Sequence, residues 1–188
     1  MIKIGITGSL ASGKTTASKI LSYKRGPLFS ADKVVRTLYQ NRSFKSLLRK
    51  KFKIMRHSHV KESIKKIIIG NSKNIKKLEK IIHPFVRGRM KMFTSFNKNK
   101  KLLFYEIPLL VESKLMNYFD VVIFIKAKKK LRLKRFKSKK GNEKLFKLLD
   151  NKQIKDKKKI RFCDFVVVNE KNLNILKKKL SAIISKYE

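Results

Sequence analysis

The stretch GITGSLASGKTT, residues 5–16, follows the short apolar run MIKI at the start of the sequence. Gly8, Gly13, Lys14 and Thr15 match the spacing G-x-x-x-x-G-K-[ST] of a phosphate-binding loop, or P-loop. The apolar run before the loop predicts a strand, and the residues after it have helical spacing. A strand, a glycine loop and a helix in this order are the context that the motif requires, which disfavours a chance match in a Gly/Ser turn.

The residue types of this loop suit a chain of phosphates. Glycines let the backbone curl so that several N–H groups point at one anion, and the following helix adds the positive end of its dipole. Lys14 is expected to reach the β- and γ-phosphates, and the Thr15 hydroxyl is expected to bind Mg²⁺. The predicted nucleotide-binding residues of the loop are Gly8, Ser9, Leu10, Ala11, Ser12, Gly13, Lys14, Thr15 and Thr16.

Short segments rich in β-branched and aromatic residues predict a buried sheet. The predicted strands are residues 2–7, 26–30, 101–107, 120–125 and 164–169. Segments with helical spacing are residues 13–23, 32–40, 128–137 and 171–187. Because strands and helices alternate, we expect a parallel five-stranded sheet between helices, which is a three-layer α/β P-loop core.

Two longer segments interrupt this alternation. Residues 44–96 lack a good strand and are helical and rich in Lys, so we expect a helical subdomain inserted between the second and third strands. Residues 132–161 form a second basic, helix-like segment before the last strand. The length of 188 residues otherwise suits a single domain, residues 1–188, that contains both segments.

The net charge of +39 is compatible with nucleic-acid, anionic-membrane or polyphosphate partners. The lysines are scattered over nearly every segment, whereas a nucleic-acid face should be clustered, so a tolerant basic surface is favoured and no specific nucleic-acid partner is expected. No apolar run approaches the ~20 residues of a membrane span, and no signal-peptide pattern is seen. The single Cys163 cannot form an internal disulfide. These features predict a cytoplasmic protein without a membrane partner.

Two carboxylates that follow predicted strands are candidates for chemistry, because ligands gather at the carboxyl edge of a parallel sheet. Glu106, after KLLFY, suits a Mg²⁺-bound water, and a surface carboxylate at a strand end is an equal interpretation. Asp32, after LFSA, suits either the acceptance of a proton from an attacking hydroxyl or the N-cap of a helix. Position alone does not separate these alternatives.

Taken together, the motifs resemble those of the dephospho-CoA kinase family. In chain order they are GITGSLASGKTT, SADKVVRTLY, LEKIIHPFVR, EIPLLVES, RLKRF, and CDFVVVN preceded by Gln153, and they run the whole length. The resemblance implies transfer of the γ-phosphate of ATP to the ribose 3′-hydroxyl of dephospho-CoA, with ATP and Mg²⁺ as cofactors, in the last step of coenzyme A biosynthesis. It also implies that residues 44–96 form a CoA-binding helical subdomain and residues 132–161 a lid.

The resemblance implies roles for residues at matching positions. Asp32 becomes the general base, and Lys14 and Arg135 stabilise charge on the transferring phosphoryl group, so these three are the predicted catalytic residues. Asn169 is implied to lie near the adenine of ATP, and residues 108–110 to shape an apolar wall for the acceptor. The predicted substrate-binding residues are Asp32, His83, Arg87, Pro108, Leu109, Leu110 and Glu112.

Several of these residues have a second interpretation. Arg87 suits either a phosphate of the acceptor or a pair with Asp32. His83 directly precedes Pro84, so it also suits the end of a helix packed in a turn. Arg135 also suits a surface cation in a Lys-rich helix.

The chain departs from the family pattern at four positions. Ser30 stands where the family has the first Asp of a D-A-D motif, and Lys139 and Leu149 stand where it usually has arginines of the lid. Cys163 stands in place of an Ala and is expected to be a small buried residue. Lys lacks the bidentate fork of Arg, so these changes bear on the lid contacts and leave the P-loop and Asp32 intact.

Two other functions fit parts of the sequence. Another small P-loop kinase, acting on a nucleoside or nucleotide, would share the loop and the fold. A nucleic-acid-binding P-loop ATPase fits the charge, although the sequence has no aromatic-plus-Arg stacking motif. A GTPase is disfavoured because N-K-x-D and D-x-x-G motifs are missing. We expect a monomer or weak oligomer that acts on a small-molecule substrate.

Overall fold

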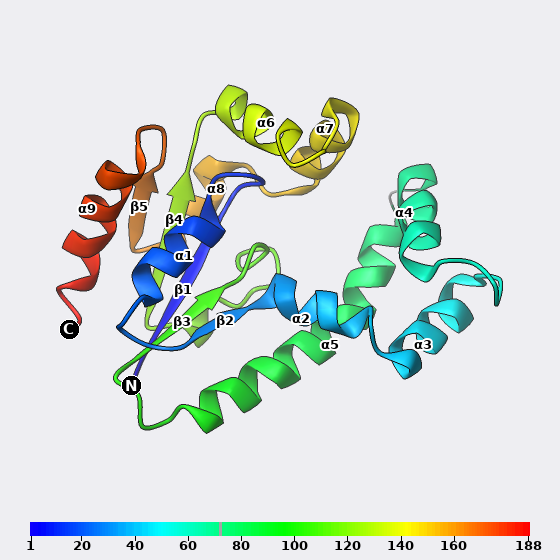
Figure 1. Cartoon of the computed structure of the whole chain (residues 1–188), viewed down its shortest axis with the longest axis horizontal. Coiled ribbons are helices and arrows are strands. Elements are labelled where there is room, and N and C mark those ends of the chain that lie inside the picture. The colour runs from blue at the N-terminus through cyan, green and yellow to red at the C-terminus, as the bar shows by residue number, and fades with distance from the viewer. Residues whose placement is uncertain (72) are drawn as a thin grey trace. The chain divides into compact units, whose positions relative to one another are not determined.

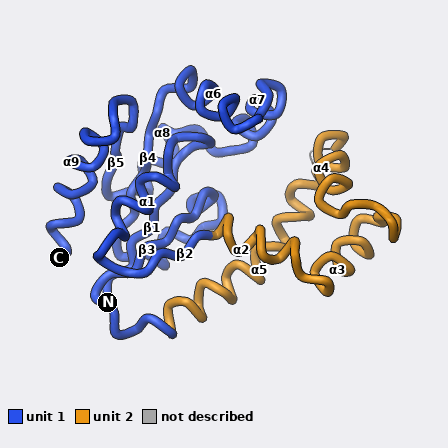
Figure 2. Tube along the Cα trace, viewed as in Figure 1, with its two compact units in different colours: residues 1–30, 96–188 blue, residues 31–95 orange. Residues whose placement is uncertain are grey.

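The structure is a computed structural model that describes residues 1–71 and 73–188 (Figure 1). The chain divides into two compact units, which Figure 2 shows in different colours. The first unit contains residues 1–30 and 96–188, and the second contains residues 31–95. Each unit has its own apolar core.

The first unit is built on a parallel sheet of five strands in the order β2-β3-β1-β4-β5 (Figure 1). The strands are β1 (Ile2–Gly8), β2 (Leu28–Ser30), β3 (Leu102–Glu106), β4 (Val121–Lys126) and β5 (Phe165–Val168). The helices are α1 (Lys14–Ser22), α6 (Lys129–Lys137), α7 (Glu143–Lys152), α8 (Asp156–Ile160) and α9 (Leu173–Ile184), with a 3₁₀ turn at Met116–Tyr118. All five predicted strands are present with small shifts at their ends, so the predicted α/β fold is confirmed.

Both faces of this sheet are covered, which explains why the strands are apolar throughout. Alternate side chains of a strand point to opposite faces. Ile4 and Ile6 are fully buried on the face that packs against α1 and α9. Gly5 faces the other side, where a Cβ atom would lie 2.8 Å from Leu110 and 2.9 Å from the Phe119 ring. The core between the sheet and the two helices contains Ile4, Ile6, Ala17, Leu21, Phe104, Ile123, Ile125, Val167, Leu176, Leu180 and Ile184.

The sheet order places β1 at the centre, between β3 and β4. The chain leaves the carboxyl end of β1 into the glycine loop and then α1. Glu106 ends β3 and Asn169 follows β5 at the same edge. In sheets of this kind, this edge is where ligands bind, because the loops after the parallel strands meet there.

The described residues of the second unit form helices joined by turns, with no strand. Its helices are α2 (Ala31–Leu38), α3 (Arg42–Phe52), α4 (Val60–Gly70) and α5 (Lys73–Phe96). The Asn41 side chain caps α3 by accepting a hydrogen bond from the Phe44 N–H. The core of this unit is made of Phe44, Leu48, Phe52, Val60 and Ile64. The assignment of this region to binding of the acceptor stays a prediction.

Helix α5 continues through Pro84, so the predicted end of a helix at His83 is wrong. Proline has no N–H to donate and normally breaks or kinks a helix. Here apolar residues before and after it are packed: Ile81 and Ile82 contact the core of the second unit, and Met90 is buried. The Phe85 ring also meets the Phe44 ring edge to face at 5.4 Å. This packing outweighs the loss of one backbone hydrogen bond.

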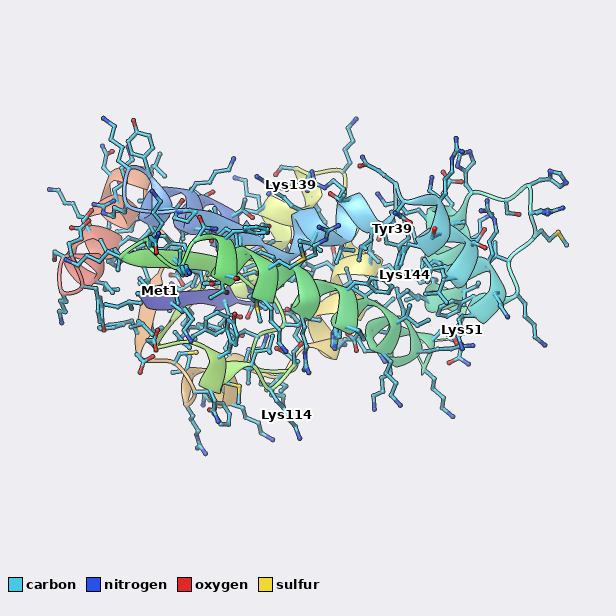
Figure 3. The ribbon with its side chains drawn as sticks, turned by 90° about the horizontal axis from the view of Figure 1, so that it is seen from below. Met1, Tyr39, Lys51, Lys114, Lys139 and Lys144 are labelled. Carbon is cyan, nitrogen blue, oxygen red and sulfur yellow. The ribbon has the colours of Figure 1, made fainter. Side chains whose placement is uncertain are left out.

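The positive charge is spread over many elements. Figure 3 labels Lys51 on α3, Lys114 after β3, Lys139 after α6 and Lys144 on α7, and all four are exposed. This distribution agrees with the interpretation of the lysines as a tolerant basic surface. None of the described helices combines the length and the apolar composition that crossing a bilayer requires.

Candidate active site

The glycines of the loop occupy positions that other residues cannot take without strain. Gly8 has a φ angle of +149° and Gly13 one of +98°. A Cβ atom on Gly8 would lie 2.3 Å from the carbonyl oxygen of Ile125, and one on Gly13 would lie 2.2 Å from Nδ2 of Asn169. The two glycines of the motif are therefore required by backbone conformation and by space.

Two polar side chains are buried inside the loop. Lys14 Nζ donates to the carbonyl oxygens of Gly8 and Ser9 at 2.9 and 2.8 Å. The Ser12 hydroxyl is buried and has no hydrogen-bond partner among the described residues. A buried hydroxyl without a partner costs free energy, and an anion in the loop would supply the missing acceptor. The loop therefore has the features of a phosphate site: a cation, a free hydroxyl and a curled backbone.

A buried carboxylate lies beside the loop. Glu106 is 3% exposed, accepts a hydrogen bond of 2.5 Å from the Thr15 hydroxyl, and accepts one of 3.1 Å from the Ser30 hydroxyl. The interpretation of Glu106 as a surface carboxylate is therefore wrong. The reason is the register of the sheet, which pairs Glu106 with Ser30 of β2 and with Ile6 of β1. Thr15 itself is exposed.

Arg135 and Asn169 contact the same carbonyl group of the loop. Asn169 Nδ2 donates to the Ser12 carbonyl oxygen at 2.9 Å, and Arg135 Nη1 donates to it at 3.2 Å. Arg135 Nη2 donates to the Asn169 carbonyl oxygen at 3.1 Å. Arg135 is half-buried and bonded to the loop, unlike the exposed cations of a Lys-rich helix face. The structure thus brings both predicted residues to the carboxyl end of the loop.

The segment after β3 is packed against the sheet. The Thr7 hydroxyl donates to the Pro108 carbonyl oxygen at 3.2 Å. Pro108 and Leu109 are half-buried, whereas Leu110 is fully buried against Gly5. An apolar wall for the acceptor at residues 108–110 stays a prediction.

Glu112, at the end of that segment, contacts Lys159 and the backbone of Ile154. Its Oε1 atom lies 2.5 Å from Nζ of Lys159 and accepts a hydrogen bond of 3.1 Å from the Ile154 N–H. Lys159 is fully buried. The role of Glu112 in substrate binding stays a prediction.

The remaining predicted residues belong to the second unit. Asp32 is the second residue of α2 and is exposed, so it is not the N-cap of that helix. His83 is half-buried on α5, and burial lowers its pKa, with Arg87 adding to the shift and Glu79 opposing it. Arg87 is exposed on the same helix. The roles of Asp32, His83 and Arg87 in the reaction stay predictions.

The predicted site lacked the side chains that hold the tip of the loop. Gln153 Oε1 accepts a hydrogen bond of 3.0 Å from the Leu10 N–H, Asp156 accepts one from the Ser9 hydroxyl, and Arg132 donates one of 3.3 Å to the Leu10 carbonyl oxygen. These residues are far from the loop in sequence; Arg132 and Gln153 lie in motifs of the family resemblance but were given no role, and Asp156 lies in none of those motifs. Glu106 was one of the two carboxylates singled out after predicted strands, whereas Ser30 was considered only as a departure from the family pattern and its contact with Glu106 was not foreseen.

Comparisons with known proteins agree with this geometry. The family model of dephospho-CoA kinase matches residues 2–174. A dephospho-CoA kinase of Bartonella quintana is 33% identical over 186 residues, which cover 96% of this chain and 95% of that protein. A dephospho-CoA kinase of Rickettsia prowazekii is 30% identical over 189 residues and covers 100% of this chain, with 98% of its own length matched.

Solved structures extend the likeness to the fold. The dephospho-CoA kinase from Campylobacter jejuni has a TM-score of 0.66 at 26% identity, covering 98% of this chain and 96% of that chain. A structure from Thermus thermophilus has a TM-score of 0.82 at 23% identity, covering 100% of this chain and 98% of that chain, and supports the fold alone. The chain therefore belongs to the dephospho-CoA kinase family.

Proposed function

We propose that this chain transfers the γ-phosphate of ATP to the ribose 3′-hydroxyl of dephospho-CoA and releases coenzyme A and ADP. The observation that carries the proposal is the family match over residues 2–174, which includes a glycine loop with the conformation of a phosphate site. The bond that breaks joins the γ-phosphorus to the β,γ-bridging oxygen. The bond that forms joins the same phosphorus to the 3′-oxygen, and the hydroxyl proton goes to a base.

The residues of the loop supply the ATP side of this reaction. The curled backbone of residues 8–16 would surround the phosphates, and Lys14 would exchange its bonds to loop carbonyl oxygens for phosphate oxygens. The buried Ser12 hydroxyl, which has no partner among the described residues, is proposed to donate to the same anion. Asn169 and Arg135 border the loop at Ser12, so they are proposed to lie on the nucleotide side, with Arg135 offsetting charge on the phosphoryl group.

The oxygen atoms beside the loop fit Mg²⁺. This ion prefers hard oxygen ligands and keeps several waters. The Thr15 hydroxyl would be the direct ligand, and the Glu106 carboxylate, 2.5 Å from it, would accept hydrogen bonds from bound water. When bound, Mg²⁺ would neutralise charge on the β- and γ-phosphates.

Asp32 is proposed as the base that accepts the proton of the 3′-hydroxyl. Its carboxylate is exposed at the start of α2, two residues after Ser30, whose hydroxyl donates to Glu106. The helical region that follows, with His83 and Arg87, is proposed to bind the acceptor. Residues 108–112 are proposed to border the same ligand, and residues 132–161 to act as a lid that excludes water. A cytoplasmic location and a monomeric or weakly oligomeric state remain predictions.

The proposal is tested by ADP release in a coupled assay, with dephospho-CoA, AMP or uridine as the acceptor. We expect turnover with dephospho-CoA and a product that mass spectrometry identifies as coenzyme A. The analogue of dephospho-CoA that lacks the 3′-hydroxyl should give no phosphorylated product. Transfer to AMP or uridine without transfer to dephospho-CoA would support another small kinase. ATP hydrolysis stimulated by RNA or DNA at physiological salt would support a nucleic-acid-dependent ATPase.

A further inference from the structure

The tip of the phosphate loop is held from outside by three side chains of the basic segment. Both polar groups of the Leu10 backbone are bonded: the N–H donates to Gln153 Oε1 at 3.0 Å, and the carbonyl oxygen accepts from Arg132 Nη1 at 3.3 Å. The neighbouring Ser9 hydroxyl donates to the Asp156 carboxylate. We call Arg132, Gln153 and Asp156 the loop clamp.

The loop clamp determines which way the peptide groups of the tip point. The Leu10 N–H points at the Gln153 side chain, and the Leu10 carbonyl oxygen points at the Arg132 side chain. With these two directions set, the backbone of the following residues, which leads into Gly13 and Lys14, has fewer conformations to lose when an anion binds. A binding site that is ordered in advance binds its ligand more tightly because less conformational entropy is lost on binding.

The clamp is itself anchored by buried charges. Glu112 Oε1 accepts from the N–H of Ile154, the residue after Gln153, at 3.1 Å. The same oxygen lies 2.5 Å from Nζ of Lys159, a side chain with 0% exposure. Arg132 is 6% exposed and lies 2.5 Å from the Asp150 carboxylate. A buried lysine needs a paired carboxylate, so Glu112 is held in place and in turn holds the backbone beside Gln153.

We propose that Gln153 and Glu112 are positioning residues for nucleotide binding, which act on the phosphate loop through Leu10 and through Ile154. Neither side chain touches the reacting atoms. The inference rests on the proposed function only in taking ATP as the nucleotide. It gives Glu112 a role on the ATP side of the site, in addition to the proposed place of residues 108–112 beside the acceptor.

The first test compares Gln153→Met with Gln40→Met, a substitution of an exposed glutamine in the second unit. Methionine keeps the length of the side chain and removes the acceptor. A cavity of about 450 Å³ lined by Ser9, Arg132 and Gln153 leaves room for it. We expect the Kd of a fluorescent ATP analogue, measured without acceptor, to rise about fivefold to tenfold in Gln153→Met, the usual effect of losing one hydrogen bond. Gln40→Met should bind like the wild type.

Kinetics and hydrogen exchange separate positioning from a general loss of structure. In Gln153→Met the KM for ATP should rise while kcat and the KM for dephospho-CoA stay within about twofold of the wild type, because no transition-state contact is removed. Exchange of the Leu10 amide, followed by NMR without nucleotide, should be faster at an unchanged melting temperature. Unchanged ATP affinity together with unchanged Leu10 exchange would overturn the inference.

The second test isolates Glu112 without leaving a buried charge. Glu112→Gln alone would strand the Lys159 ammonium and destabilise the protein, so two double variants are compared: Glu112→Gln with Lys159→Met, and Glu112→Leu with Lys159→Met. Both remove the ion pair, but only glutamine keeps an acceptor for the Ile154 N–H. We expect the Kd for ATP to be about fivefold higher in the leucine variant than in the glutamine variant. Equal ATP affinities, or a rise only in the KM for dephospho-CoA, would show that Glu112 does not act on the loop.

Failure of the proposed function would be visible separately. A wild-type chain that binds no ATP contradicts the function, whereas the exchange rate of the Leu10 amide reports on the clamp in either case. In another outcome, the wild type turns over dephospho-CoA while the clamp variants keep both their ATP affinity and their rate of Leu10 amide exchange. That result would contradict only the inference.

Discussion

The Thr15 hydroxyl donates a hydrogen bond of 2.5 Å to Glu106, a residue that follows it by 91 positions in the chain. The second oxygen of the same carboxylate accepts from Ser30. One buried acid therefore joins the first residues of α1, the end of β2 and the end of β3. These contacts fix the position of the acid, so a substitution of Glu106 tests its proposed role in Mg²⁺ binding.

Glu106→Gln should weaken the use of Mg²⁺. The amide keeps the size of the side chain but loses the charge that would orient metal-bound water. Loss of a group that orients the ligands of a metal typically costs about 10-fold to 100-fold in metal affinity. We expect the Mg²⁺ concentration for half-maximal activity to rise at least about 10-fold. The matched control is Glu62→Gln, an exposed position on α4, and equal Mg²⁺ requirements in the two variants would contradict the assignment.

Asp32→Asn should abolish most of the turnover while leaving nucleotide binding intact. General-base catalysis contributes about 100-fold or more to a rate, and asparagine cannot accept the proton. We expect kcat to fall by that factor, with an unchanged Kd for ADP and an unchanged melting temperature. Steady-state kinetics with saturating dephospho-CoA measures the effect. A variant with full kcat would show that another group takes the proton.

Gly13→Ala should destroy the phosphate site. The new Cβ would lie 2.2 Å from Nδ2 of Asn169, and the φ angle of +98° is unfavourable for alanine. We expect ATP binding to weaken by more than about tenfold, because one clash or strained residue typically costs 1–3 kcal/mol. The control is Gly70→Ala, where an added Cβ meets nothing within 4 Å. Isothermal titration with ATP compares the two, and similar affinities would contradict the account of the loop.

The stability of the protein should fall on acidification partly through His83. Burial lowers the pKa of this imidazole from its usual 6.5. Between the lowered pKa and 6.5 the unfolded chain binds more protons than the folded one, so the free energy of unfolding falls as the pH falls through this window, and the loss is complete below it. Above the unfolded pKa the group has no effect.

The measurement is urea unfolding of the wild type and of His83→Asn at several pH values from about 5 to 7.5, the range in which histidine titrates. The wild type should lose more stability on acidification than the variant does. The control is His57→Asn, at an exposed position in the turn before α4, and this variant should lose as much stability on acidification as the wild type. Parallel curves for the wild type and His83→Asn would remove His83 as a cause.

Most of the fold could be predicted because its signals are local. The P-loop spacing, the apolar strands and the helical periodicity each lie within a dozen or so residues, and alternation then implies a parallel sheet. The rule that a proline ends a helix failed at Pro84, because α5 continues through this residue. Proline disfavours a helix on average, but the packing of Ile81, Ile82 and Met90 depends on contacts with other helices, which a local rule does not contain.

The candidate site could be predicted only in part, for the same reason. The loop residues carry a spacing that is specific in itself. Glu106 could be placed at the carboxyl end of a strand from the sequence, but its contact with Thr15, 91 positions away, could not. Gln153 and Asp156 contact Leu10 and Ser9 over 143 and 147 positions, and these contacts became clear only when the basic segment was placed in space. Asp156 has no distinguishing neighbour in the sequence, so its contact with Ser9 had no local signal.

The hydrogen bond from Asn169 to the Ser12 carbonyl oxygen spans 157 residues. The strands that flank β1 are also far from it in sequence, since residues 2–6 pair with residues 102–106. During synthesis on the ribosome, the glycine loop is therefore made well before the strands and side chains that complete it. Chains dominated by such distant pairings fold slowly. Strand β1 has to stay unpaired without aggregating until its partners have left the exit tunnel, and the many charged lysines help to keep the growing chain in solution during that time.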